Sequence, residues 1–305
     1  MAKPSRGKAL PACANAETLR LPKTSLNRSG SLKGEAPVPI ASLEKSLHAQ
    51  GLLQIPAQWV ALSGGRSNRV WRVSQAGAQD LCVKLYPQTA WQNPLFANDP
   101  ASEYYCLENF HAEQLCPKPL GLVETPQGRC LVYHHHRGVS FSDQTAPVGQ
   151  LLARIHSRPA VLADSKAIRH APCGSSELNA HTMQILQRCE GPERALLERL
   201  RPTIPVKKPK EVCLIHADPV ANNIVISGHT ALLIDWQSPA LGDPMEDLSH
   251  FLSPAMHQLY RGQILNAEQQ RQVLNAYQTR YPRFDFARFE RLYPHYSWRI
   301  AAYCL

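Results

Sequence analysis

The sequence lacks long apolar runs and closely spaced cysteine pairs. No stretch approaches the roughly 18 uncharged apolar residues that a membrane-spanning helix needs, so we expect no transmembrane segment. Nine cysteines are present, but no two lie closer than ten residues, which excludes a Cys-x-x-C metal or redox pair. Several lie in apolar stretches such as Leu81-Cys82-Val83, where a free thiol behaves as a small hydrophobe. We therefore expect reduced thiols and a cytoplasmic protein.

Positive charge is concentrated at the start of the chain. Residues 1–45 contain eight Lys or Arg against three Glu, so five of the nine net positive charges lie there and four remain for the other 260 residues. The basic run at residues 207–210 lacks interleaved aromatic residues, and we therefore expect no nucleic-acid partner. Residues 1–40 hold five prolines and no apolar period, which predicts a disordered tail. A transit peptide is an alternative, although the prolines disfavour the amphipathic helix that it needs.

Strand-like sequence precedes helix-like sequence along the rest of the chain. Alternating apolar residues predict strands in four stretches: Val60–Val73, Leu81–Leu85, Leu120–Glu124 and Arg129–His134. Helices are predicted to begin at Asp99-Pro100 and to cover Val148–His156, roughly Ser175–Arg201 and segments after Ala267. The pattern predicts an α+β protein with two lobes, a β-rich one over residues 41–136 and a mainly helical one over 137–305. The site is expected in the cleft between them.

Polar residues converge on a predicted hairpin. Two short apolar stretches flank Gly228-His229, a pair typical of a type II′ turn. Counting outward from this loop places Asn223 opposite Ile234 and beside Asp235, with Asp218 five residues upstream of Asn223. Oxygen ligands of this kind suit Mg²⁺, and a carboxylate that is not needed for metal can accept the proton of an attacking hydroxyl. An ordinary hairpin with polar residues at its open end is the alternative.

The spacing His216-x-Asp218-x-x-x-x-Asn223, followed by Ile234-Asp235-Trp236, resembles the aminoglycoside phosphotransferase and choline kinase-like superfamily of the kinase-like fold. Further segments resemble this superfamily in the same order along the chain: the phosphate loop at Leu62–Val70, the lysine strand at Cys82–Leu85, the hinge at Leu131–Gly138 and the Gly-Asp-Pro motif at Gly242–Leu248. The resemblance covers about residues 55–255. The loop sequence is nearer the choline or thiamine kinase branch.

The resemblance implies a phosphotransferase that uses ATP and Mg²⁺. Asp218 would be the catalytic base, while Asn223 and Asp235 would bind the metal. Lys84 would hold the α and β phosphates, with Glu103 keeping it in place. The phosphates would also contact the loop that contains Ser63, Gly64, Gly65, Ser67 and Asn68, because glycine lets backbone N–H groups approach closely.

The acceptor is expected to be the hydroxyl group of a small molecule. Val220 stands where protein kinases carry a lysine after the base, and only seven residues separate Asp235 from Asp243, which leaves no platform for a peptide. Aromatic residues gather near the end of the chain, and they could bind a quaternary ammonium or thiazolium group by cation–π contacts. They are Phe284, Phe286, Phe289, Tyr293, Tyr296, Trp298 and Tyr303. This favours a choline-, ethanolamine- or thiamine-like alcohol, although an ordinary helical core would show the same spacing.

Other interpretations stay open at this point. An aminoglycoside or a sugar is the alternative acceptor, and an inactive nucleotide-binding module is the alternative function. A metal site at His134, His135 and His136 is disfavoured, because consecutive residues of a strand point to opposite faces. The chain stops in an apolar helical run, so an acceptor lobe that continues beyond Leu305 is a further alternative.

Overall fold

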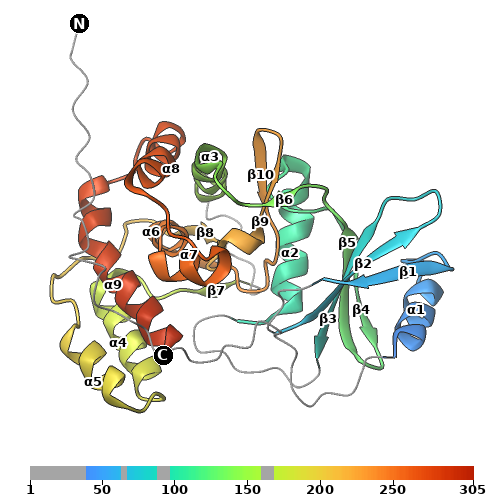
Figure 1. The fold of residues 1–305 in the computed structure, drawn as a ribbon, viewed down its shortest axis with the longest axis horizontal. Helices are drawn as coiled ribbons and strands as arrows, with labels where there is room; N and C mark the ends of the chain where they lie inside the picture. The colour runs from blue at the N-terminus through green and yellow to red at the C-terminus, as the bar shows by residue number, and fades with distance from the viewer. Residues whose placement is uncertain (1–38, 63–66, 88–96, 159–167) are drawn as a thin grey trace, which may run out of the picture.

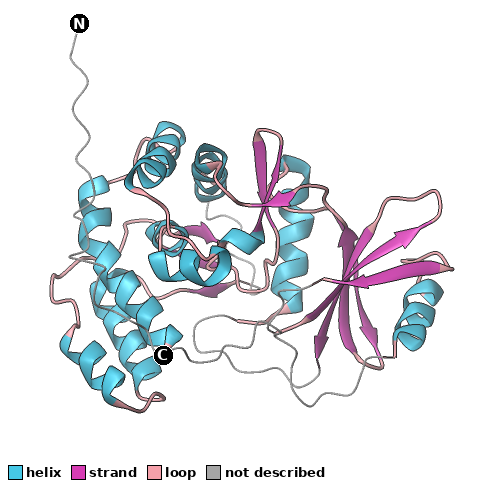
Figure 2. Ribbon diagram, in the orientation of Figure 1, coloured by secondary structure: helices cyan, strands magenta, loops and turns pink. Residues whose placement is uncertain are grey.

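A computed structural model of the protein describes residues 39–62, 67–87, 97–158 and 168–305. A β-rich part lies beside a mainly helical part, as Figure 1 shows, and Figure 2 distinguishes the helices from the strands. This is the α+β arrangement that the sequence predicts. None of the helices within these ranges combines the length and the apolar character needed to cross a bilayer. The tail over 1–40 falls almost wholly outside the described residues.

An antiparallel sheet of five strands, in the order β1-β2-β3-β5-β4, forms the first part. Its strands are β1 (Ala57–Ala61), β2 (Arg69–Gln75), β3 (Leu81–Pro87), β4 (Pro119–Thr125) and β5 (Gly128–His134). The sequence predicted a single strand over Val60–Val73. The structure instead has two strands there, paired so that Val60 lies opposite Arg72. The other three strands lie where the sequence predicts them.

The central strand β3 divides the first part into two faces. Val83 and Leu85 pack into a small core that also contains Leu43 and Leu47 of α1 (Ile40–Ala49). Because neighbouring side chains of a strand point to opposite faces, Lys84 points the other way. That second face is covered by α2 (Pro100–Phe110). Lys84 is therefore buried between the sheet and the rest of the molecule.

Helix α2 begins as the sequence predicts. The Asp99 side chain accepts a hydrogen bond from the backbone N–H of Ala101, and Pro100 occupies the first helical position. Glu103, Leu107 and Phe110 are all buried on this helix. One face of α2 thus carries a carboxylate beside two core residues.

Helices dominate the second part. They are α3 (Thr145–His156), α4 (Gly174–Leu186), α5 (Pro192–Arg199), α6 (Met245–Phe251), α7 (Pro254–Arg261), α8 (Ala267–Arg280) and α9 (Phe286–Cys304), with short 3₁₀ turns at His111–Glu113 and Ala221–Asn223. The helix predicted over Ser175–Arg201 is two helices, broken before Gly191, whose φ is +94°. Helix α3 packs against α8, and α4 packs against α9. Gly149 allows the first contact, because a Cβ there would lie 2.3 Å from the carbonyl oxygen of Val273.

Two small sheets support the loops of the second part. One has the order β10-β9-β6 and the other β7-β11-β8. Their strands are β6 (Val139–Ser140), β7 (Arg169–His170), β8 (Cys213–Ile215), β9 (Ile224–Ser227), β10 (Thr230–Leu233) and β11 (Ala240–Gly242). The β9–β10 hairpin has the predicted register, with Ser227 opposite Thr230, and the φ of Gly228 is +59°. Ile234 donates its backbone N–H to the carbonyl oxygen of Asn223 at 2.9 Å, so these two residues lie opposite each other as expected.

The aromatic residues near the end of the chain form part of the core. Phe284, Phe289 and Tyr296 are almost completely buried. The ring of Phe284 packs edge-on against Tyr277 at 5.2 Å and tilted against Phe289 at 5.7 Å. These rings contact one another, which favours the core interpretation over a cage for a cationic ligand.

Candidate active site

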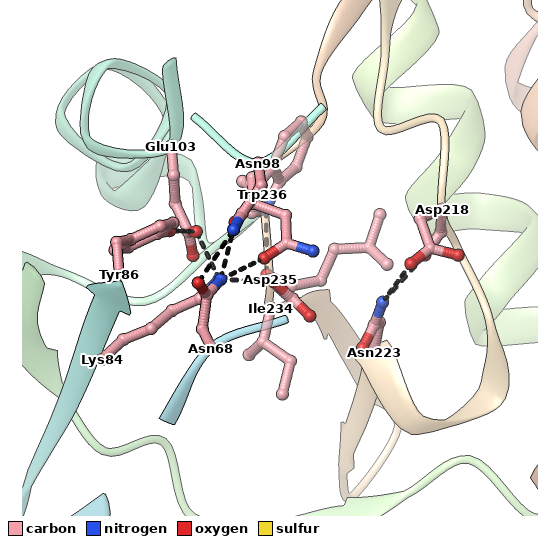
Figure 3. Close-up of polar contacts among 12 residues, drawn as sticks. Asn68, Lys84, Tyr86, Asn98, Glu103, Asp218, Asn223, Ile234, Asp235 and Trp236 are labelled. Carbon is pink, nitrogen blue, oxygen red and sulfur yellow. Dashed lines mark hydrogen bonds and ion pairs between the residues drawn. The ribbon is translucent and has the colours of Figure 1, made fainter. Parts of the chain in front are cut away.

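Lys84 lies between two carboxylates that come from different parts of the chain. Its Nζ is 2.5 Å from Oε2 of Glu103 on α2 and 2.5 Å from Oδ1 of Asp235, which follows β10 (Figure 3). The side chains of Lys84 and Glu103 are 3% and 1% exposed, whereas that of Asp235 is 31% exposed. The structure therefore brings together three of the residues that the sequence assigned to nucleotide and metal.

Tyr86 belongs to the same cluster, although the sequence analysis did not single it out. Its hydroxyl donates a hydrogen bond to Oε2 of Glu103, and its ring centroid lies 5.0 Å from the Nζ of Lys84. The signal that could have found Tyr86 is its position two residues after Lys84, which places both side chains on one face of β3. Tyr86 fixes the carboxylate with which Lys84 pairs.

Burial and mutual attraction act in opposite directions on the charges of this cluster. Burial alone would lower the pKa of Lys84, but Asp235 and Glu103 outweigh it and raise that pKa, so the ammonium form persists. Burial raises the pKa of Glu103, opposed by Lys84 and reinforced by the second carboxylate, Asp235. One cation between two carboxylates leaves an excess negative charge. A further cation, or a proton, would be attracted to it.

Asp218 and Asn223 lie across the site from Lys84, as Figure 3 shows. The amide nitrogen of Asn223 donates to the backbone carbonyl oxygen of Asp218 at 3.0 Å and contacts its Oδ2 at 3.3 Å. This arrangement leaves Oδ1 of Asn223 without a hydrogen bond from any described residue. The structure therefore pairs Asn223 directly with Asp218, whereas Asp235 pairs with Lys84.

Two buried side chains brace the loop that carries Asp218. Both oxygens of Asp247 accept backbone hydrogen bonds at 2.8 Å, Oδ1 from Ala217 and Oδ2 from His216. The ring of His216 contacts the carbonyl oxygen of Ile234 through Nε2 at 3.1 Å. Burial lowers the pKa of His216, so its ring is neutral and its Nε2–H is the donor to that carbonyl. The loop is thus fixed to the segment that follows β10 and carries Asp235.

Among the described residues other than glycine, three have a positive φ, and two of these lie in this site. Ala217 has a φ of +66° and Asp235 a φ of +65°, a region that residues other than glycine seldom adopt. Such conformations persist where the surrounding contacts impose them, and they cluster at functional sites. The contacts of Asp247 and Lys84 supply that constraint here.

The predicted phosphate loop is described only in part. Ser63, Gly64 and Gly65 lie outside the described residues, and Ser67 is partly buried. The amide of Asn68 donates to Oδ1 of Asn98 at 2.8 Å and to Oε1 of Gln237 at 2.6 Å. Gln237 lies 169 positions away in sequence, so this amide cluster joins the two parts of the molecule. The side chain of Asn68 is therefore occupied by contacts within the protein.

The donor chemistry of the site fits a Mg²⁺ ion. No group of three or more His, Cys, Asp or Glu side chains in the described ranges forms a metal centre by itself. Mg²⁺ nevertheless binds through one or two protein oxygens together with substrate phosphates and water. Oδ1 of Asn223 and the partly exposed carboxylate of Asp235 offer such oxygens.

Comparison with known proteins places the chain among phosphotransferases. A family model described as the phosphotransferase enzyme family matches residues 58–290. A search of curated proteins finds no match.

Solved structures show the fold. A putative aminoglycoside phosphotransferase from Ralstonia eutropha is 15% identical, with a TM-score of 0.61 and 86% of each chain covered. A macrolide 2′-phosphotransferase from Brachybacterium faecium is 16% identical, with a TM-score of 0.54 and coverage of 80% of this chain and 84% of that one. An aminoglycoside phosphotransferase variant solved with ADP and hygromycin B is 14% identical, with a TM-score of 0.53 and coverage of 86% and 88%. The predicted kinase-like fold is therefore confirmed.

Proposed function

The chain belongs to the phosphotransferase enzyme family, and from that premise we propose that it transfers the γ-phosphoryl group of ATP to a hydroxyl group of a small molecule. One observation carries the proposal. The buried ammonium of Lys84 is held by Glu103 and Asp235, while Asp218 lies across the same site with its carboxylate 18% exposed. A cation suited to phosphates and a carboxylate suited to accept a hydroxyl proton thus lie in one site (Figure 3).

Each residue has a physical role in this proposal. Lys84 binds the nucleotide phosphates, and Glu103 and Tyr86 orient it. Asn223 and Asp235 hold Mg²⁺, which when bound neutralises charge on the transferred group. Asp218 accepts the proton of the acceptor hydroxyl while the new O–P bond forms and ADP leaves.

The acceptor is the finer part of the proposal. The phosphate-loop sequence favours a choline-, ethanolamine- or thiamine-like alcohol. An aminoglycoside is the alternative, because a solved aminoglycoside phosphotransferase of the same fold binds hygromycin B together with ADP. Because Phe284, Phe289 and Tyr296 pack into the core, a cationic acceptor would have to be bound by other groups. We keep the choline-like alcohol as the first candidate and the aminoglycoside as the second.

The test combines an acceptor screen with one substitution. ATP turnover is measured with choline, ethanolamine, thiamine, aminoglycosides and sugars, and ATP binding is measured by calorimetry. Asp218→Asn should lower kcat by about 10²–10⁴-fold while ATP still binds, because only the proton acceptor is lost. Asp143→Asn, which alters a carboxylate that is 67% exposed, is the matched control and should not change kcat. A near-normal kcat for Asp218→Asn would refute the assignment.

A further inference from the structure

A buried histidine that belongs to none of the recognised motifs lies against the proposed base. Nε2 of His250 is 3.3 Å from Oδ1 of Asp218, and the histidine side chain is 3% exposed. His250 belongs to α6, three residues after Asp247. The Gly-Asp-Pro motif ends at Leu248, so motif spacing gives no reason to single it out.

Helix α6 holds His250 in a fixed place relative to the catalytic loop. Residues three apart on a helix lie on the same face, so Asp247 and His250 both point toward that loop. Asp247 accepts two backbone hydrogen bonds from the loop, at 2.8 Å each, and its Oδ2 also contacts Nε2 of His156 at 3.0 Å. The backbone before Asp218 is therefore anchored to the helix that carries His250.

Each of the two oxygens of Asp218 has its own neighbouring side chain. Oδ1 faces Nε2 of His250 at 3.3 Å, and Oδ2 faces the amide nitrogen of Asn223 at 3.3 Å. The terminal torsion of an aspartate is intrinsically broad, so a carboxylate without such neighbours would rotate. Contacts on both oxygens restrict that rotation and determine which lone pair faces an incoming hydroxyl.

We propose that His250 is a positioning residue that orients the carboxylate of Asp218 for proton abstraction. The inference rests on the proposed function, since it concerns how the base of that reaction is aimed. The imidazole directs an Nε2–H toward Oδ1, because a bare lone pair there would be repelled by the carboxylate. His250 keeps this proton throughout. The proton of the acceptor goes to Asp218, so no bond to His250 forms or breaks. The 3.3 Å contact falls short of hydrogen-bond geometry in this structure, and we expect it to tighten when substrates bind, because catalytic hydrogen bonds are often long or poorly aligned in free enzymes.

A second buried histidine on the neighbouring helix provides the control. His257 of α7 is 2% exposed, and its ring packs against Phe251 at 5.1 Å and Phe141 at 6.0 Å. Its Nδ1 contacts the guanidinium of Arg261 at 3.3 Å. His257 thus has the burial and the aromatic neighbours of a core histidine. It differs from His250 in its polar contact, which is with Arg261 and not with Asp218.

The experiment compares His250→Ala, His250→Gln and His257→Ala. It measures kcat, the KM for ATP and the Tm, using whichever acceptor of the screen turns over, or water as acceptor in ATP hydrolysis if none does. His250→Ala should lower kcat by about 10–100-fold with the KM for ATP unchanged, because a small misplacement of a catalytic group has that effect. His250→Gln should recover most of the loss, since its amide nitrogen can replace Nε2. His257→Ala should lower the Tm and leave kcat unchanged.

A double-mutant cycle with Asp218→Asn separates this inference from the proposed function. If His250 acts only through the base, His250→Ala should cause no further loss of kcat in the Asp218→Asn background, whereas independent effects would multiply. Multiplying effects, or the absence of rescue by His250→Gln, would overturn the positioning role while the base assignment stands. An unchanged kcat for Asp218→Asn alone would overturn the base assignment, and the inference would fall with it.

Discussion

Replacing Lys84 by methionine removes the cation that both Glu103 and Asp235 contact, while the side-chain length is nearly retained. Glu103 is completely buried and would be left without that countercharge. Removing one partner of a buried ion pair costs about 3–5 kcal/mol. The Asp235 side chain is 31% exposed, so water compensates for most of its loss. We therefore expect the free energy of unfolding to fall by about 3–5 kcal/mol at neutral pH, a large part of the roughly 5–15 kcal/mol of a typical protein.

The pH dependence of this loss has a definite sign. Burial raises the pKa of Glu103, and without Lys84 the opposing attraction disappears, so that pKa rises further. The folded Lys84→Met variant then binds a proton more readily than its unfolded chain does. Stability falls with rising pH wherever the folded state binds more protons. The destabilisation should accordingly be largest near pH 7 and shrink toward pH 5, where the carboxyl can be neutral.

Urea unfolding followed by circular dichroism, at both pH values, measures the effect. The double variant Lys84→Met/Glu103→Gln should be more stable than Lys84→Met at pH 7, because it leaves no buried charge on α2. Arg72→Met is the control, since the Arg72 side chain is 46% exposed where it pairs with Asp80, just before β3, and the stability of this variant should not change. An unfolding free energy of Lys84→Met that equals the wild-type value, or a loss that is the same at both pH values, would contradict the buried cluster.

Three further outcomes follow from the site and its surroundings. Asn68→Leu should lower the free energy of unfolding by about 1–3 kcal/mol and weaken ATP binding in calorimetry, because it leaves the partly buried amides of Asn98 and Gln237 without this partner; unchanged values would show that the amide cluster does not join the two parts. Burial lowers the pKa of His257 from 6.5 to about 4, so the unfolded chain binds more protons in that window and stability is lost as pH falls through it. His257→Gln should reduce the fall in Tm as pH drops from 6.5 to about 4. An equally steep fall in the variant would refute the role of His257 in this pH dependence. Activity of Asn223→Ala should recover partly at high Mg²⁺ and that of Asp235→Ala should not, whereas equal Mg²⁺ dependence in both would refute their roles as metal ligands.

The sequence predicted the parts of the fold that depend on local rules. The turn at Gly228-His229 determined the hairpin register, and Asp99-Pro100 determined where α2 begins. The split into two parts and the kinase-like fold were also predictable from the order of strands and motifs. The break in the first predicted strand falls at residues 63–68, where glycine and polar residues interrupt the apolar pattern, so the turn signal was present but was not used to end the strand. Helices α6 and α7 were missed because each is shorter than two and a half turns, too short to show a clear period.

Contacts in the site between segments that are distant along the chain could not be predicted from the sequence. Nothing near Asn68 indicates that Gln237 will accept its hydrogen bond, and nothing in the motif indicates that His250 will face Asp218. Such pairs depend on how α6 and the sheet are placed after folding. Spacing along the chain does not encode that placement.

Lys84 and Glu103 are the exception among the distant pairs, and the reason is energetic. A lysine between Val83 and Leu85 in a central strand is unfavourable by itself, as is a glutamate on the helix face that buries Leu107 and Phe110. Each local pattern breaks the rule that charges avoid the core, and each becomes tolerable only if a charge of opposite sign meets it. A buried lysine and a buried glutamate in the same lobe are therefore predicted to contact each other. In the structure, Nζ of Lys84 lies 2.5 Å from Oε2 of Glu103. Neutral amides such as Asn68 carry a smaller penalty for burial, so their partners cannot be inferred in this way.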